Sequence, residues 1–224
     1  TVSSTAITTA TEDAVYTYTL TGADADVGDT LTMSGTTVPS WLTFTASTGV
    51  LTGTPTNDNV GTTGNAVVLT ITDAAGESVT DSFTITVANT NDAPSFSSSP
   101  VLTAQEDDVY TYTAVGTDMD AGDTFTLGSS SVPSWLTFTA STGVLTGTPT
   151  NSDVGSHSVT LTVTDAAGAT GTQTFTITVS NANDAPTVTS TAVTSATEDS
   201  VYTYTLTASD ADVGDTLTMA GTTV

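Results

Sequence analysis

Hydrophobic and polar residues alternate along most of the chain with the period of two that is typical of β-strands, and helical periodicity is nearly absent. Tyr16, Tyr18 and Leu20 share one face of a predicted strand, and the threonines between them share the other. Turns rich in Gly, Pro, Asn and Asp separate such segments, which predicts an all-β sandwich. The further residues expected on its inner faces include Leu31, Met33, Leu42, Phe44, Val67, Leu69, Ile71, Phe83, Ile85 and Val87.

The whole pattern recurs two and a half times along the chain. Glu12, Glu106 and Glu198 occupy the same place in successive copies, 94 and 92 residues apart. Pro39–Thr56 returns without a change as Pro133–Thr150. Repetition at this period predicts a tandem array of similar domains rather than one large core. Such an array indicates a spacer, stalk or filament before it indicates an enzyme.

The predicted domain boundaries fall at two Asn-Asp-Ala-Pro segments, because proline ends a strand ladder and restrains the residue before it. We expect cadherin-like or immunoglobulin-like sandwiches over residues 1–92 and 93–184, arranged end to end, and the first strands of an incomplete third repeat over residues 185–224. Two explanations of the third repeat stay open. Either the chain is a window of a longer polypeptide that completes it, or a neighbouring chain donates the missing strands.

The charge balance narrows the range of partners. The chain has 24 acidic residues, one histidine and neither lysine nor arginine, for a formal net charge of -24. Nothing can neutralise phosphate, so nucleic acids and anionic membrane surfaces are excluded as partners. Every carboxylate must therefore be solvated, capped by backbone N–H groups or held by a bound cation. There is no cysteine, and no apolar run is long enough to span a bilayer.

Carboxylates recur at alternating positions in one predicted turn of each copy. Asp24, Asp26 and Asp29 form this pattern in the first copy, and it returns from Asp118 and from Asp210. Calcium takes about six to eight oxygen ligands in irregular geometry, which suits such a cluster, whereas zinc would need His or Cys. An EF-hand is excluded, because the flanking segments are predicted strands and the expected glutamate is missing. The alternative, that Asp and Asn only fill sandwich turns, stays open.

Several short motifs occur in the same order in both full copies. They are Glu-Asp before a Val-Tyr-Thr-Tyr strand, Asp-x-Asp, Pro-Ser-Trp-Leu-Thr-Phe, Thr-Gly-Val-Leu-Thr-Gly-Thr-Pro, Thr-Asp-Ala-Ala-Gly and Asn-Asp-Ala-Pro. Each motif alone is weak, but their joint occurrence is specific. With them the chain resembles the bacterial cadherin-like repeats of the dystroglycan type, also described as putative-Ig repeats, which occur in tandem in very large bacterial surface proteins.

The resemblance implies calcium ions held between successive domains, as in cadherins. The implied ligands of the first junction are Glu12, Asp58, Asn89, Asn91, Asp92, Asp118, Asp120 and Asp165. Those of the second junction are Glu106, Asp153, Asn181, Asn183, Asp184, Asp210 and Asp212. Asp24, Asp26 and Asp73 would serve a junction with a preceding domain, and Glu198 is the third-copy counterpart of Glu12.

The chain departs from the cadherin pattern at two places. Cadherin linkers read Asp-x-Asn-Asp-Asn-x-Pro, whereas Asn89–Pro94 reads Asn-Thr-Asn-Asp-Ala-Pro, which is one residue shorter and begins with Asn. In addition, Asp153 aligns with Asn59 rather than with Asp58. Both changes reduce the ligand charge and could cost one ion per junction.

These features favour a calcium-stiffened spacer, stalk or filament of a large extracellular or cell-surface protein, secreted and bacterial. The alternative is an adhesin module that binds carbohydrate or another cell-surface ligand, and identical chains could also meet in a filament or sheath. Trp41 and Trp135 are expected in the core rather than on a sugar-binding platform. We do not expect an enzyme, because no motif pairs His157 with a nucleophile. Paired carboxylates can hydrolyse glycosidic bonds. Here they recur in every copy at turns beside the linkers, which favours metal binding over catalysis.

Overall fold

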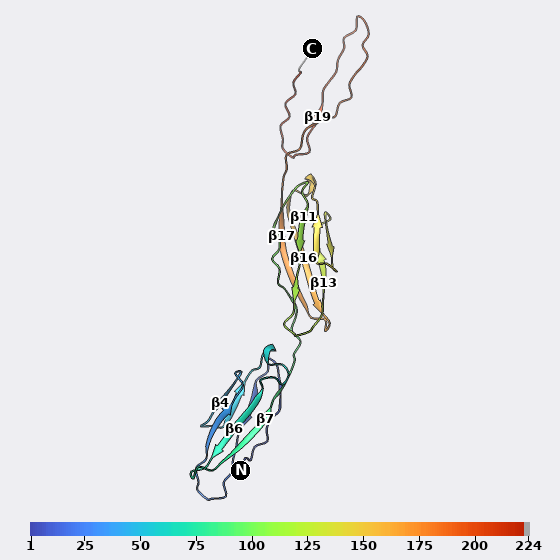
Figure 1. Cartoon of the computed structure of the whole chain (residues 1–224). Helices are drawn as coiled ribbons and strands as arrows, with labels where there is room; N and C mark the ends of the chain where they lie inside the picture. Colours follow the sequence, from blue (N-terminus) through green and yellow to red (C-terminus); the bar gives the residue numbers. More distant parts are fainter. Residues whose placement is uncertain (222–224) are drawn as a thin grey trace. The chain divides into compact units, whose positions relative to one another are not determined.

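The computed structural model describes residues 1–221, so the last three residues of the predicted third repeat lie outside the described part. Strands dominate residues 1–221, with two short 3-10 turns, and no helix there is long and apolar enough to cross a membrane. The chain forms two compact units (Figure 1). The first comprises Thr1–Ala93 with the loop Asp118–Thr124, and the second comprises Pro94–Thr117 with the chain from Phe125 onward. The all-β prediction is confirmed.

The first unit is a sandwich of two antiparallel three-stranded sheets, with strand orders β2-β5-β4 and β3-β6-β7, and a short parallel pair β1-β8. Side chains of both sheets meet in one core, where Tyr18, Leu51 and Leu69 are buried. Its elements are β1 (Thr9–Thr11), β2 (Tyr16–Thr19), β3 (Thr32–Thr37), β4 (Leu42–Thr45), β5 (Val50–Gly53), η1 (Asn57–Asn59), β6 (Ala66–Thr72), β7 (Ser78–Thr84) and β8 (Thr86–Ala88).

The second unit repeats this plan with sheets β10-β17-β16-β13 and β11-β15-β14 and the small pairs β12-β9 and β18-β19. Tyr112, Leu145 and Leu161 occupy the core. Its elements are β9 (Ser95–Phe96), β10 (Thr103–Gln105), β11 (Tyr110–Thr113), β12 (Gly116–Thr117), β13 (Phe125–Ser131), β14 (Leu136–Thr139), β15 (Val144–Gly147), η2 (Asn151–Asp153), β16 (Gly155–Asp165), β17 (Thr170–Ser180), β18 (Thr187–Val188) and β19 (Ala208–Ser209).

The two tryptophans belong to the cores, as the sequence predicts. Trp41 packs against the first core with its ring 5.9 Å from that of Tyr16, in an edge-to-face arrangement. Trp135 repeats this contact with Tyr110, also at 5.9 Å. Edge-to-face pairs of this kind add about 0.5–1.5 kcal/mol beyond the burial of their area.

In each unit a tyrosine of one sheet donates a hydrogen bond to a side chain of the other sheet, and the acceptor differs between the units. Tyr18 donates to Oδ2 of Asp81 at 2.6 Å, whereas Tyr112 donates to Oε1 of Gln173 at 2.8 Å. Burial and, second, the hydrogen bond to the Asp81 carboxylate raise the pKa of Tyr18 to about 12. Both partners lie in the strand opposite the tyrosine, so this polar contact fixes how the two sheets pack.

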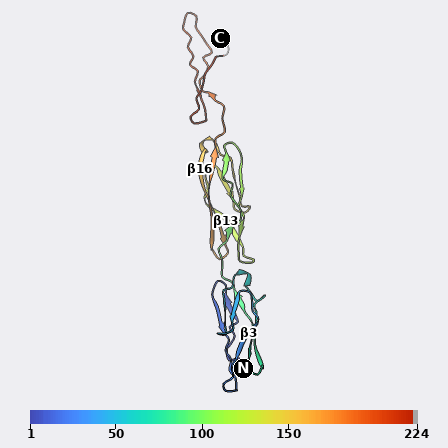
Figure 2. The same cartoon turned by 90° about the vertical axis from the view of Figure 1, so that its left-hand side faces the viewer.

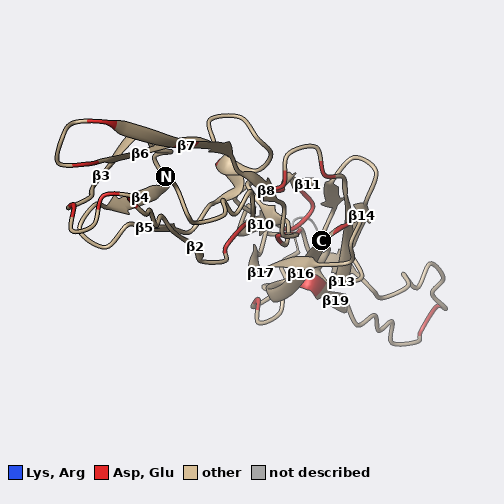
Figure 3. Cartoon of the chain, turned by 90° about the horizontal axis from the view of Figure 1, so that it is seen from below, with Lys and Arg blue, Asp and Glu red and all other residues tan. Residues whose placement is uncertain are grey.

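In both views of the chain, the strands of each unit run along its length and its loops gather at its ends (Figure 2). Most acidic residues lie in those loops, and the chain has no lysine or arginine to pair with them (Figure 3). In the third repeat, Tyr202 and Tyr204 are 51% and 36% exposed, whereas their counterparts in the first unit are buried.

Candidate metal centres

Each unit holds a buried glutamate directly after a short strand, β1 in the first unit and β10 in the second. Glu12 follows β1, is 3% exposed, and accepts a hydrogen bond of 3.1 Å from the Thr90 N–H through Oε2. The backbone oxygen of Glu12 accepts a second bond of 3.1 Å from the Thr90 hydroxyl. In the second unit Glu106 is 2% exposed and accepts a longer bond of 3.3 Å from the Ala182 N–H. The glutamate is therefore tied to the linker that leaves its own unit.

Asp120 provides the second buried carboxylate of the first unit, and it accepts hydrogen bonds from two residues of the linker. Its Oδ1 accepts the side-chain amide of Asn89 at 2.8 Å, and its Oδ2 accepts the backbone N–H of Asp92 at 2.8 Å. The Asn57 amide, from η1, donates to Oδ2 of Asp92 at 2.7 Å. An open hollow of about 450 Å³ lies among Asn57, Val60, Asn89, Asn91, Asp120, Ala121, Gly122 and Asp123.

Asp212 repeats this arrangement in the second unit. It accepts the Asn181 amide at 2.8 Å, the Asp184 N–H at 2.7 Å and the Asn151 amide at 3.3 Å. These bonds, above all that from the Asp184 N–H, lower the pKa of Asp212 below its usual value, so its carboxylate stays ionised. The second unit also holds two acidic clusters in which carboxylate oxygens lie within 4.8 Å of one another. One consists of Glu106, Asp107 and Asp184, and the other consists of Asp212 itself with Asp210 and Asp215.

The donor sets fit calcium on electrostatic grounds. Glu12, Glu106, Asp120 and Asp212 are between 2% and 7% exposed in a chain that has no lysine or arginine. Oδ2 of Asp118 is buried and has no hydrogen-bond partner among the described residues. Burial of an ionised carboxylate without a counter-charge is costly. A divalent cation that prefers carboxylate, amide and carbonyl oxygens offsets that cost at this kind of site.

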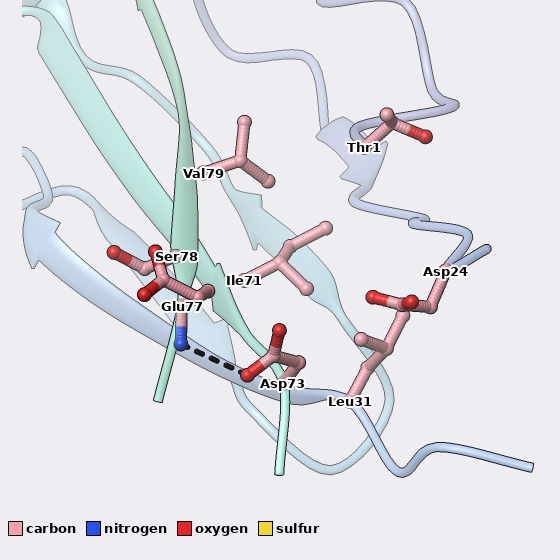
Figure 4. Close-up of a pocket in the computed structure, with 8 residues that line it drawn as sticks. All are labelled: Thr1, Asp24, Leu31, Ile71, Asp73, Glu77, Ser78 and Val79. Carbon is pink, nitrogen blue, oxygen red and sulfur yellow. Dashed lines mark hydrogen bonds between the residues drawn. The ribbon is translucent and has the colours of Figure 1, made fainter. Parts of the chain in front are cut away.

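A third acidic cluster lies in the first unit, where Asp24, Asp26 and Asp29 are all exposed and have oxygens within 4.8 Å. Asp24 and Asp73 both line a shallow hollow, in which Oδ1 of Asp73 accepts the Glu77 N–H at 2.9 Å (Figure 4). The Asp24–Asp29 loop is the first-repeat counterpart of the second-repeat loop that begins at Asp118, and all three of its carboxylates are exposed.

The remaining predicted ligands lie in various surroundings. Asp58 is exposed on η1, where its neighbour Asn57 makes the contact to the linker. Asp153 caps its own turn by accepting the Thr150 N–H and hydroxyl at 2.9 and 2.8 Å. Asp165 is buried and accepts the N–H groups of Gly168 and Ala169. Asn91 and Asn183 donate to the backbone oxygens of Asp92 and Asp184, and Glu198 is exposed.

The sequence analysis did not single out three residues that lie beside these carboxylates, namely Asn57, Asn151 and Asp107. The first two open the η1 and η2 turns, and their recurrence after Gly-Thr-Pro-Thr in both copies was the available signal. Asp107 has φ 63°, in the left-handed region that non-glycine residues avoid, and this conformation accompanies its place beside Glu106 and Asp184. Its counterparts Asp13 and Asp199 share the conformation, with φ of 59° and 60°.

Two successive β-sandwiches of one plan, each with buried acidic residues in the loops at its ends, define a tandem array of immunoglobulin-like or cadherin-like repeats. The chain belongs to the family described as "Putative Ig domain", whose model matches residues 1–88 and 93–180. This confirms the resemblance that the motifs indicate. The members of this family are repeats without enzymatic activity, and the chain is not an enzyme.

The relatives by sequence include the "Serine-rich adhesin for platelets" of Staphylococcus aureus, which is 33% identical over 155 residues, 66% of this chain and 6% of the relative. The protein of the same description in strain MRSA252 is 32% identical, with 10% of its length covered. The chain thus spans a tenth or less of the length of these relatives. Solved structures of similar fold include protocadherin gamma B2 domains 3–6, with a TM-score of 0.55, 16% identity and 92% and 54% of the two chains covered. The protocadherin gamma B4 extracellular domain has a TM-score of 0.53, with 20% identity over 96% and 40%.

Proposed function

We propose that this chain is a calcium-binding structural segment of an extracellular bacterial surface protein of the adhesin type, in which bound calcium stiffens the array of repeats. The observation that carries the proposal is the recurrence of one arrangement of buried carboxylates in two units of a chain without lysine or arginine. In the first unit it consists of Glu12, Asn89, Asp92 and Asp120, and in the second of Glu106, Asn181, Asp184 and Asp212.

Within each unit these residues would hold the ion between the linker and the acidic loop. Glu12 accepts the Thr90 N–H of the linker, Asp92 lies in the linker, and Asp120 contributes a carboxylate that already contacts both Asn89 and the Asp92 N–H. Calcium, when bound, supplies the positive charge that the sequence lacks. Its removal leaves carboxylates that repel one another at the linker, so the repeats should move more freely.

The test is small-angle X-ray scattering on the chain during a calcium titration after EGTA treatment, with thermal unfolding in parallel. We expect a longer and narrower particle in calcium, and a stabilisation of about 2.7 kcal/mol per site at a hundredfold excess over the dissociation constant. The variant with Asp120→Asn and Asp212→Asn is the control and should lose both effects. An unchanged scattering profile and melting temperature in the wild-type chain would refute the calcium role.

Adhesion is a second candidate, because the relatives by sequence are named as adhesins for platelets. Binding of the immobilised chain to platelets, in calcium and in EGTA, tests it directly. Contact between identical chains in a filament or sheath predicts association, which sedimentation at increasing protein concentration measures. A monomer at all concentrations that binds no platelets would leave the spacer role alone.

A further inference from the structure

A buried asparagine links the core tryptophan of the first unit to the turn that lines its metal centre. Asn65 is 1% exposed, and its Oδ1 accepts the Nε1–H of Trp41 at 2.9 Å. Its side-chain nitrogen donates to the backbone oxygens of Asn59 at 2.8 Å and Gly61 at 3.1 Å. The side chain therefore uses its acceptor and its donors at once, which is the condition for burying an amide without a penalty.

The turn that Asn65 holds is η1, and η1 reaches the centre. Asn57, its first residue, donates the 2.7 Å bond to Oδ2 of Asp92. Both Asn57 and Val60, which follows the turn, line the hollow beside Asp120. A chain of contacts thus runs from the Trp41 ring through Asn65 and η1 to the carboxylate of Asp92, and every hydrogen bond in it lies within the first unit.

The second unit has a histidine where the first has this asparagine. His157 lies opposite Ile177 in the β16–β17 pair, as Asn65 lies opposite the equivalent Ile85. His157 makes a single bond to η2, from Nε2 to the backbone oxygen of Asp153, and its ring meets the edge of Trp135 at 5.8 Å. Nε1 of Trp135 is buried and has no hydrogen-bond partner among the described residues.

The η2 turn also makes weaker contacts to its centre. The Asn151 amide lies 3.4 Å from Oδ2 of Asp184 and 3.3 Å from Oδ1 of Asp212, whereas the corresponding Asn57 bond in the first unit is 2.7 Å. The η2 turn thus has fewer hydrogen bonds to the core side chain that holds it, and its own hydrogen bonds to the aspartates are longer. A ligand shell that is held less firmly must be ordered when the ion binds, and that ordering reduces affinity.

We propose that Asn65 is a positioning residue of the first calcium centre, and that its replacement by His157 makes the second centre the weaker of the two. This inference rests on the proposed calcium binding. Neither residue contacts the ion; each acts through the η turn. The array would then fill its sites in order as calcium rises, so that stiffness changes in steps along the chain.

The variants Asn65→His and His157→Asn test this proposal, and titration calorimetry measures the calcium affinity of each. Asp120→Asn is added to remove the first centre, so that the second can be measured alone. We expect His157→Asn to tighten the second centre about fivefold, the value of one ordinary hydrogen bond, and to leave the first unchanged. Asn65→His should weaken the first centre by a similar factor. Thr63→His, at an exposed position in the same loop, is the matched control and should change neither.

A readout without calcium separates this inference from the proposed function. In EGTA, amide hydrogen exchange at the η2 turn should slow in His157→Asn, and exchange at η1 should speed up in Asn65→His. Calcium binding with unaltered affinities in both variants would overturn the positioning role while the calcium role stands. Absence of calcium binding in every variant would overturn both. If Asn65→His fails to fold, His157→Asn alone decides.

Discussion

The side-chain amide of Asn89 donates a hydrogen bond of 2.8 Å to Oδ1 of Asp120, and Asn181 makes the same bond to Asp212 at the same 2.8 Å. In each case a linker asparagine donates to a loop aspartate whose carboxylate is buried. The two residues are 31 positions apart in both copies. Because the same contact recurs with the same spacing, it belongs to the repeated fold and is not specific to one copy.

The first prediction concerns this aspartate. Asp120→Asn should abolish calcium binding at the first centre while leaving the second intact, because it removes the carboxylate that contacts both Asn89 and the Asp92 N–H. In EGTA the same change should leave stability equal or slightly higher, since one buried and uncompensated charge disappears. Calorimetry in calcium and thermal unfolding in EGTA measure the two effects. Asp58→Asn, which removes an exposed charge, serves as the control; an equal loss of binding there would assign the site to Asp58 instead.

The second prediction concerns the left-handed aspartate Asp107. Asp107→Gly should relieve its unfavourable backbone conformation and raise calcium-free stability by about 1 kcal/mol. The same change should weaken calcium binding at the second centre, because it removes one of three clustered carboxylates. Denaturant unfolding in EGTA and a calcium titration would show the two opposite effects. Asp108→Gly removes a neighbouring exposed charge without that strain, and should weaken stability instead.

The third prediction is a pH dependence at η2. Two bonds from Thr150, first its N–H and then its hydroxyl, lower the pKa of Asp153 below its usual value. A lowered folded-state pKa gives a stabilisation that is present above the unfolded pKa and is lost as the pH falls through the folded value. Thr150→Val should therefore move the pKa of Asp153 upward and shift this acid-side loss to higher pH. Carboxyl NMR titration in calcium-free buffer measures it. Thr56→Val, where uncharged Asn59 caps the turn, should show no such shift.

The fourth prediction exploits the exchange of Asp81 for Gln173 between units. Asp81→Gln should retain the bond from Tyr18 and lower the pKa of that phenol from about 12, because the carboxylate is one cause of the rise. A raised folded-state pKa gives a stabilisation that is fully present below the unfolded pKa of 10.0. That stabilisation is lost as the pH rises through the folded-state pKa of about 12. Tyrosinate absorbance during alkaline titration follows the change. Asp81→Ala, which removes the acceptor, should cost about 1 kcal/mol in thermal unfolding at neutral pH. An identical alkaline titration in wild type and Asp81→Gln would contradict this account.

Much of the fold could be read from local pattern. Alternation placed Tyr16, Tyr18 and Leu20 on a buried face, and all three are at most 4% exposed. The two tryptophans were expected in the cores and lie there. Local pattern was less able to choose between neighbours on a turn, and it favoured Asp58 where Asn57 faces the linker. A one-residue choice on a 3-10 turn depends on how the turn is held, and the residue that holds it, Asn65, lies in another element.

The sequence by itself determined that this protein is a tandem array of β-sandwiches, because a period of two and a long exact repeat are properties of the chain alone. It also determined that no carboxylate can pair with lysine or arginine, because the chain contains neither residue. Only the tertiary structure decided which carboxylates lose contact with water and which amides meet them. Burial of Glu12 and Asp120 depends on segments far apart in sequence that meet only in the folded unit. The same holds for the difference between Asn65 and His157, because a hydrogen bond to a buried tryptophan exists only once the sheets have packed.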